Sequence, residues 1–113
     1  MQTSARVFIF FLAAIIIQLP VQAQQVAKRI PYPASPDGVI GFLEFRPDGY
    51  GTQLHPLIIF LHAREERGNG KTQLNSVIAN GIPHYCANGA SMQFVHGGQT
   101  SSFVVLSPQL SLQ

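Results

Sequence analysis

The sequence predicts an α/β fold in which an antiparallel opening strand is followed by a parallel strand–helix–strand unit. Two apolar runs, residues 57–61 and 102–107, have the length and composition of strands buried in a sheet. Between them, residues 72–79 carry apolar side chains at helical spacing. Two strands joined through a helix are expected to run parallel, with a right-handed connection. The sheet is therefore predicted to be mixed.

The first stretch of the chain predicts an extended segment that ends in a turn. Residues 24–35 contain Pro31 and Pro33, which exclude a helix and disfavour a central strand. Pro36 and Gly38 follow at positions that suit a β-turn of type I or II. This segment is expected to lead into the sheet without forming its centre.

Residues 39–46 predict a strand near the edge of the sheet. Side chains of this stretch alternate between two faces, and the pattern is mostly apolar with one acidic residue, Glu44. A second turn follows at residues 47–51. This turn favours a hairpin or a short connection to the apolar run at residues 57–61.

The run at residues 57–61 is predicted to be a central strand that is buried on both faces. The charged residues 64–67 and the glycine-rich segment 68–70 cannot continue such a strand. The chain is therefore expected to leave the sheet at His62. In open α/β sheets, ligands bind beyond the carboxyl ends of the strands. The loop after His62 is thus the first candidate for a functional site.

Residues 72–79 are the best helix candidate, because their apolar residues at positions i, i+3 and i+4 form one face. Gly81 can adopt the left-handed conformation that ends such a helix. A second short helix is predicted from Ile82 to near Asn88, since Pro83 is tolerated in a first turn. The stretch at residues 94–98 predicts no regular element.

Residues 1–23 have the pattern of a secretory signal peptide. Arg6 supplies the positive charge, residues 7–19 are apolar apart from Gln18, and cleavage after Ala23 satisfies the small-residue rule. The apolar run is shorter than the ~20 residues that a membrane-spanning helix needs. The sequence therefore predicts a secreted or periplasmic protein with no stable membrane anchor after cleavage.

The composition argues against several classes of function. Charged residues make up 11% of the 113 residues, the net charge is +2, and the basic residues are scattered. A nucleic-acid partner requires a basic patch or stripe, so none is expected. Cys86 is the only cysteine, which excludes an intramolecular disulfide. Its expected role is that of a small buried apolar side chain.

Three stretches of the chain carry the motifs of one family. They read LIIFLH at residues 57–62, AREERGNG at residues 63–70 and FVVLSPQ at residues 103–109. Together they resemble the first half of secreted α/β-hydrolases of the esterase, phospholipase/carboxylesterase and polyhydroxybutyrate-depolymerase-like kind. In that group an apolar strand precedes an HGxGERG loop, and a later strand ends in SPQ. The resemblance covers residues 39–109.

The resemblance implies that residues 57–61 are the third strand of an incomplete α/β-hydrolase sheet. The loop from His62 would then form half of an oxyanion hole, in which a fixed backbone N–H stabilises the charge of an acyl-transfer transition state. The implied catalytic group is the backbone N–H of Arg64, and His62 orders the loop. Glu66 and Arg67 would stabilise the loop as an ion pair. The implied substrate is a small-molecule ester, with no cofactor and no metal.

The sequence departs from the family pattern in two ways. Ala63 and Glu65 replace two loop glycines, and a loop that needs positive φ there would be reshaped. No G-x-S-x-G elbow occurs, since Gln93 stands where the glycine after Ser91 belongs. Residues 24–113 are therefore expected to be the N-terminal portion of an α/β-hydrolase domain, without nucleophile, acid or base and inactive alone. The alternative is a non-catalytic, small secreted α/β binding or remnant protein.

Two other kinds of site are weaker matches. Residues 70–72 match the end of a phosphate-binding loop, but Glu65 stands where its first glycine is required and would repel phosphate. His84, Cys86 and His96 could hold a metal, but their spacing matches no usual zinc pattern. The last predicted strand would leave an exposed sheet edge, so self-association through this edge is expected.

Overall fold

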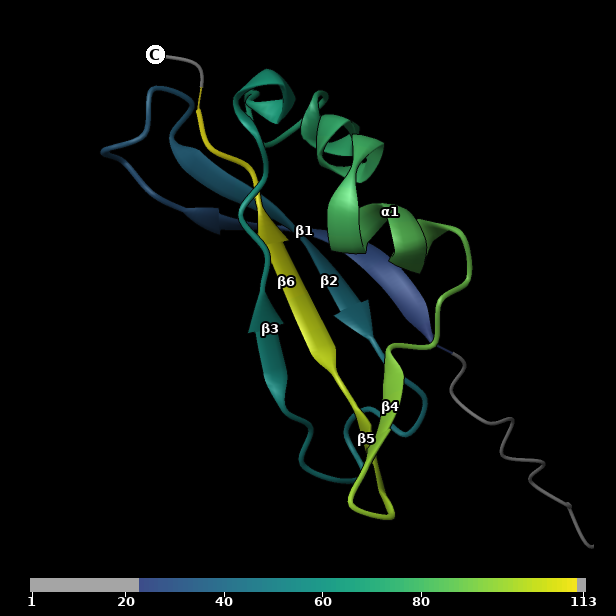
Figure 1. Cartoon of the computed structure of the whole chain (residues 1–113). Coiled ribbons are helices and arrows are strands. Elements are labelled where there is room, and N and C mark those ends of the chain that lie inside the picture. The colour runs from purple at the N-terminus through teal and green to yellow at the C-terminus, as the bar shows by residue number, and fades with distance from the viewer. Residues whose placement is uncertain (1–22, 112–113) are drawn as a thin grey trace, which may run out of the picture.

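The computed structural model describes residues 23–111, and its largest element is a sheet of four strands in the order β1-β2-β6-β3 (Figure 1). The strands are β1 Gln24–Pro31, β2 Val39–Arg46, β3 Leu57–Ile59 and β6 Val104–Pro108. β2 pairs antiparallel with both β1 and β6, whereas β3 and β6 run parallel. The predicted mixed sheet and the α/β content are confirmed.

The opening segment forms a full strand at one edge of the sheet. β1 pairs with β2 from Gln24 opposite Arg46 to Pro31 opposite Val39. Proline is tolerated there because an edge strand has no neighbour on its outer side. β2 is consequently an inner strand next to the edge strand, which agrees with its predicted position near the edge. An inner position is possible because Lys28 of β1 pairs with the one acidic side chain of β2.

β6 lies between β2 and β3, so these two strands do not form the hairpin that the turn at residues 47–51 favoured. Val105 of β6 is fully buried and lies opposite Phe45 on one side and Ile58 on the other. An apolar strand gains most burial as an inner strand, which explains why the later strand takes this place. The parallel pairing of β3 and β6 confirms the predicted strand–helix–strand unit.

β3 is the other edge strand, and its predicted burial on both faces is wrong. Leu57 and Ile59 are 53% and 59% exposed, whereas Ile58 packs against the core. The chain continues alongside β6 for one more residue, since the Phe60 N–H donates to the Leu106 carbonyl at 2.9 Å. Successive side chains of a strand point to opposite faces. The helical elements of the described chain cover only one of these faces (Figure 1).

Three helical elements connect β3 to the second half of the sheet. They are η1 Arg64–Glu66, η2 Leu74–Ala79 and α1 Gly81–Ala87. The helix predicted at residues 72–79 is a shorter 3₁₀ helix, whose buried residues Leu74 and Val77 belong to the predicted apolar face. Gly81 has a φ of 68°, the left-handed conformation expected after that helix. Pro83 lies in the first turn of α1, as predicted.

A hairpin occupies the region where the sequence predicted no element. β4 Gln93–His96 pairs antiparallel with β5 Gln99–Ser102. Gly97 and Gly98 join them with φ values of 57° and 75°, as a two-residue hairpin turn requires. Two adjacent glycines were the available signal. Because Ser102 belongs to β5, the strand predicted from residue 102 begins at residue 104.

The core lies between the sheet and the helical elements (Figure 1). Its buried members are Phe45, Cys86, Met92 and Val105 in one cluster and Leu43, Leu74 and Val77 in the other. Burying one such large apolar side chain contributes about 1.5–3 kcal/mol. The helical elements are thus attached to the sheet at two places, which fixes the loops between them.

The expected signal peptide, residues 1–23, lies outside the described residues except for Ala23. The Ala23 N–H donates to the Asp48 carboxylate, next to the start of β1. Within residues 23–111, no helix has both the length and the apolar character needed to cross a membrane.

Candidate functional site

The loop that follows β3 lies at the carboxyl edge of the parallel pair of strands. It runs from His62 to Gly70 and contains η1. Figure 1 shows this segment continuing upward from β3, beside the chain that leaves the end of β6. Ligands of open α/β sheets bind beyond this edge. The predicted site residues therefore lie where the topology favours a site.

Glu66 closes the loop from within. It is 3% exposed, and its carboxylate accepts hydrogen bonds from the Ala63 N–H at 2.9 Å and from the Asn80 side-chain amide at 2.8 Å. The bond from Ala63 joins the last residue of η1 to the residue before its start. The bond from Asn80 attaches the loop to the residue that follows η2. The predicted ion pair with Arg67 is absent from the ion pairs of the described residues. The Glu66 carboxylate instead accepts hydrogen bonds from two uncharged donors.

Gln109 holds the loop from the other side. It is 4% exposed, and its Nε2 donates to the carbonyls of Glu66 at 2.9 Å and Gln73 at 2.8 Å. Its Oε1 accepts from the Gly70 N–H at 2.9 Å. One buried amide thus satisfies three backbone groups of a loop that has few backbone partners of its own. The sequence offered only the motif SPQ here, and its spacing did not reveal this role.

His62 connects the loop to the chain beyond β6. Its Nε2 accepts a hydrogen bond from the Leu110 N–H at 2.8 Å, and its Nδ1 contacts the Ala63 carbonyl. These partners assign the ring proton to Nδ1, because Nε2 must accept. The histidine therefore links the loop to a segment 48 residues further along the chain.

Arg64 is exposed and takes the first position of η1. First helical N–H groups have no partner inside the helix, and the Arg64 N–H has no acceptor among the hydrogen bonds of residues 23–111. Ala63 before it is extended, with φ −74° and ψ 169°. Among the described non-glycine residues only Met92 has a positive φ, so neither Ala63 nor Glu65 is strained. The two missing family glycines therefore do not reshape this loop through positive φ.

Two glycines let the loop cross the sheet at close range. Gly70 has a φ of 64°, and a Cβ added there would lie 2.6 Å from the Gly41 nitrogen of β2. A Cβ on Gly41 would lie 2.0 Å from the Gly70 carbonyl oxygen. No side chain can occupy either position without moving backbone. The end of the loop is therefore pinned directly to the sheet.

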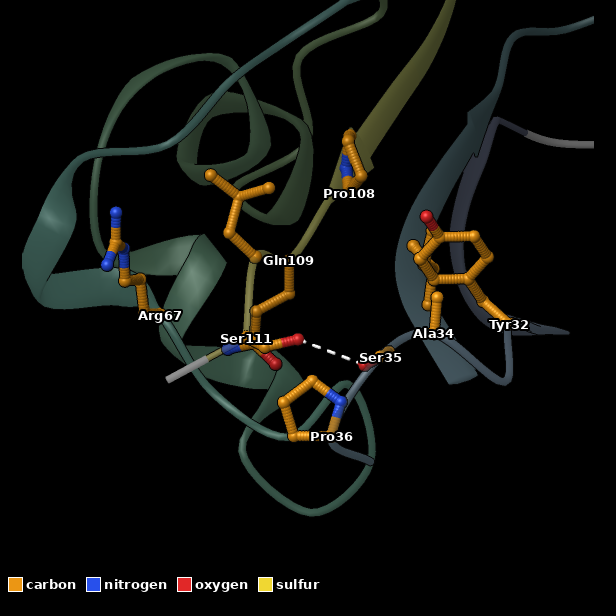
Figure 2. Close-up of a pocket in the computed structure, with 10 residues that line it drawn as sticks. Tyr32, Ala34, Ser35, Pro36, Arg67, Pro108, Gln109 and Ser111 are labelled. Atoms are coloured by element: carbon orange, nitrogen blue, oxygen red, sulfur yellow. Dashed lines mark hydrogen bonds between the residues drawn. The ribbon is translucent and has the colours of Figure 1, made fainter. Parts of the chain in front are cut away.

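A pocket of about 510 Å³ opens beside the loop. It is lined by Tyr32, residues 34–36, Ile40, Arg67 and residues 108–111. Figure 2 shows Arg67 and Tyr32 on opposite sides, with Pro36, Gln109 and Ser111 between them. The volume is within the range of pockets for small molecules. The sequence did not predict this pocket, because its walls come from three separate parts of the chain.

The other chemically notable residues lie away from the loop. Burial in the core raises the pKa of the Cys86 thiol to about 11, in agreement with its expected role as a small apolar side chain. His84 is exposed, and its Nδ1 lies 3.2 Å from the Ile78 carbonyl oxygen. Within the described part of the chain, no group of three or more histidine, cysteine or acidic residues is arranged to hold a metal.

Comparisons add no family name to these observations. No protein-family model matches the chain, and no curated protein matches it either. At the level of fold class, residues 23–111 form a mixed α/β structure with one parallel pair of strands and a side-chain-braced loop at their carboxyl edge.

Proposed function

We propose that residues 62–70 form the oxyanion-hole loop of a secreted serine hydrolase of the carboxylic-ester type. The observation that supports this most directly is the Arg64 N–H, which has no acceptor among the described hydrogen bonds and stands on a loop after a parallel strand. In hydrolases of the α/β class, one oxyanion donor comes from the loop after the third strand. β3 is the third strand of residues 23–111.

The proposed chemistry requires a donor that does not move. When a nucleophile attacks an ester, negative charge develops on the carbonyl oxygen, and a fixed N–H stabilises it without reorganisation. Glu66 and Gln109 hold the two ends of the loop by buried hydrogen bonds. His62 orders the loop through the Leu110 N–H. These contacts support a positioning role for the three side chains and a donor role for the Arg64 backbone.

The same proposal assigns the nucleophile, acid and base to residues outside this sequence. The 113 residues contain no G-x-S-x-G elbow. Ser91 is exposed, but it lies in the short segment between α1 and β4 and has no elbow sequence around it. The loop is thus part of a hydrolase site that this chain alone does not complete.

The chain alone is therefore expected to show no ester turnover. We would measure hydrolysis of p-nitrophenyl butyrate by the 113-residue chain against buffer, together with labelling by a fluorophosphonate probe. The predicted result is a rate equal to that of buffer and no labelled serine. Turnover above buffer that the probe abolishes would show that the chain holds its own nucleophile and would contradict the proposal.

The donor itself is tested by its response to a tetrahedral anion. We would titrate ¹⁵N-labelled chain with methyl methylphosphonate, whose oxygens resemble those of the acyl-transfer intermediate, and follow the amide resonances. The Arg64 amide is expected to shift downfield in a saturable manner, since it gains a charge-assisted hydrogen bond. The amide of Ala63 is the internal control, because it already donates to Glu66. An Arg64 resonance that does not respond would contradict the donor role.

The alternative is a non-catalytic secreted binding protein. The pocket beside the loop favours it, because the pocket needs no nucleophile to hold a small molecule. Both proposals assume a protein outside the cytoplasm, because the sequence of residues 1–23 has the pattern of a secretory signal peptide. In the hydrolase proposal the loop stabilises the carbonyl oxygen of an ester under attack. In the binding-protein proposal the loop has no catalytic role.

A further inference from the structure

We propose that the pocket beside the loop binds a small carboxylate with an apolar body, and that the Arg67 guanidinium receives the carboxylate. The pocket has a volume of about 510 Å³ and lies at the carboxyl edge of β6. Arg67 forms part of its wall. This inference does not rest on the oxyanion proposal, since it involves a side chain rather than the Arg64 backbone.

Arg67 has unsatisfied hydrogen-bonding capacity. Its side chain is half-buried, and its Nε is buried without a hydrogen-bond partner. Neither ion pair of the described residues involves Arg67, because both are made by Glu44. The neighbouring Glu66 carboxylate is occupied by two other donors. A buried Nε–H without a partner is unfavourable, and the guanidinium has no anionic partner among the described residues, so a bound anion would supply one.

The remaining walls select a carboxylate that carries an apolar group. Tyr32, Pro36, Ile40 and Leu110 offer apolar surface. A single guanidinium fits the planar, singly charged carboxylate in a bidentate manner. A phosphate dianion usually meets several basic groups or a nest of N–H donors, and no lysine or second arginine lines this pocket. The geometry thus favours an aliphatic or aromatic monocarboxylate over inorganic phosphate.

The pocket is preformed on the side of the loop. Ser35 is 8% exposed, and its Oγ lies 3.0 Å from the Ser111 Oγ, a hydrogen bond drawn in Figure 2. The Asp37 N–H also donates to the Ser35 Oγ at 3.3 Å. Gln109 is fixed by its three bonds to the loop. Little ordering is needed when a ligand enters, which favours affinity.

The test compares an acid with its uncharged amide. We would titrate the 113-residue chain at pH 7 with hexanoate, hexanamide and inorganic phosphate, and follow the amide and the arginine Nε–H resonances by NMR. Hexanoate is expected to bind at least about tenfold more tightly than hexanamide and to shift the Arg67 Nε–H resonance. Phosphate is expected to bind more weakly than hexanoate. Equal binding of acid and amide, or no binding of the acid, would overturn the proposal.

Two variants locate the site. Arg67→Gln is expected to abolish the preference for hexanoate over hexanamide, whereas Arg29→Gln, an exposed arginine that does not line the pocket, should keep it. Ala34→Trp places a large side chain at an exposed lining position and should weaken both ligands at least about tenfold. This second variant keeps Arg67 and the loop, so it remains informative if Arg67→Gln disturbs folding.

Two outcomes of the titrations with these variants would contradict the proposal. A preference for hexanoate that survives in Arg67→Gln, or hexanoate binding that Ala34→Trp leaves unchanged, would place the ligand elsewhere and overturn the assignment. The Arg64 amide reports on the oxyanion proposal and the Arg67 Nε–H on this one. Failure of either proposal is therefore seen separately.

Discussion

Glu44 takes part in both ion pairs of the described residues. Its carboxylate is 2.8 Å from Lys28 Nζ and 2.8 Å from Arg46 Nη2, and it accepts a third hydrogen bond from the Tyr50 hydroxyl. Burial raises its pKa, but hydrogen bonds from Lys28 and Arg46, together with their charges, outweigh burial and hold the pKa below 4.5. An acidic residue can thus occupy an inner strand.

This pKa shift predicts how stability depends on pH. A carboxyl whose folded-state pKa is lowered contributes stability above its unfolded value of 4.5, and this contribution is lost as the pH falls through the lower folded-state pKa. Glu44→Gln is therefore expected to lower the free energy of unfolding by about 1–3 kcal/mol at pH 7. The difference from the unsubstituted protein should shrink below pH 4.5. Urea unfolding at several pH values measures both quantities.

The matched control for this substitution is Glu65→Gln. Glu65 is exposed and takes part in neither ion pair of residues 23–111. Its replacement should leave the free energy of unfolding at pH 7 nearly unchanged. A Glu44→Gln variant that is as stable as the Glu65→Gln variant at pH 7 would contradict the proposed role of the cluster around Glu44.

Among the elements, sequence patterns correctly predicted the features that depend on residues close together in the chain. β2, the apolar face of η2 and the left-handed Gly81 follow from alternation, helical spacing and turn chemistry. The neighbours of each strand depend on contacts far apart in sequence, so the position of β6 between β2 and β3 was missed. The candidate site also combines features that a local motif predicts with contacts between residues far apart in sequence. The motif predicted a loop that contains His62 and Arg64 and is stabilised by Glu66, whereas the partners of Glu66 and the hydrogen bonds of Gln109 depend on the folded chain.

The contact between the loop and β2 gives a prediction at this scale. Gly70→Ala should destabilise the protein because the residue has a positive φ and its Cβ would meet Gly41. Gly38→Ala is the matched control, since Gly38 also has a positive φ, 71°, but has nothing within 4 Å of an added Cβ. Positive φ alone costs about 1–3 kcal/mol, and we expect Gly70→Ala to exceed Gly38→Ala by at least about 1 kcal/mol. Equal destabilisation in urea unfolding would show that the close contact is unimportant.

At the scale of the whole molecule, the edge at β3 and the apolar part of the sheet face that the helical elements leave uncovered are accessible. Leu57 and Ile59 of β3 and Ile30 of β1 are each at least half exposed. Register places these three side chains on the face opposite the helical elements. Within the described residues, no strand pairs with the outer side of β3. Such an edge, without charged residues, favours pairing with another strand.

The expectation that the last strand leaves the exposed edge is wrong, because β6 is paired on both sides. We expect the chain to self-associate through the edge at β3 instead. Sedimentation velocity over a range of micromolar concentrations should show a species larger than the monomer. Ile59→Lys places a charge on the edge strand and is expected to restore the monomer. Leu54→Lys is the matched control, because Leu54 is fully exposed but lies outside the strands, and it should still self-associate. A monomeric unsubstituted chain, or an equal effect of both substitutions, would contradict this expectation.

The proposed donor role of the Arg64 backbone N–H can be separated from that of its side chain by a pair of substitutions. Arg64→Ala keeps the N–H, whereas Arg64→Pro removes it at a first helical position, after an extended Ala63 that suits proline. The measurement is the affinity for methyl methylphosphonate by NMR titration. We predict that Arg64→Ala binds nearly as well as the unsubstituted chain, and that Arg64→Pro binds about tenfold more weakly or worse. Equal affinities of the two variants would contradict the claim.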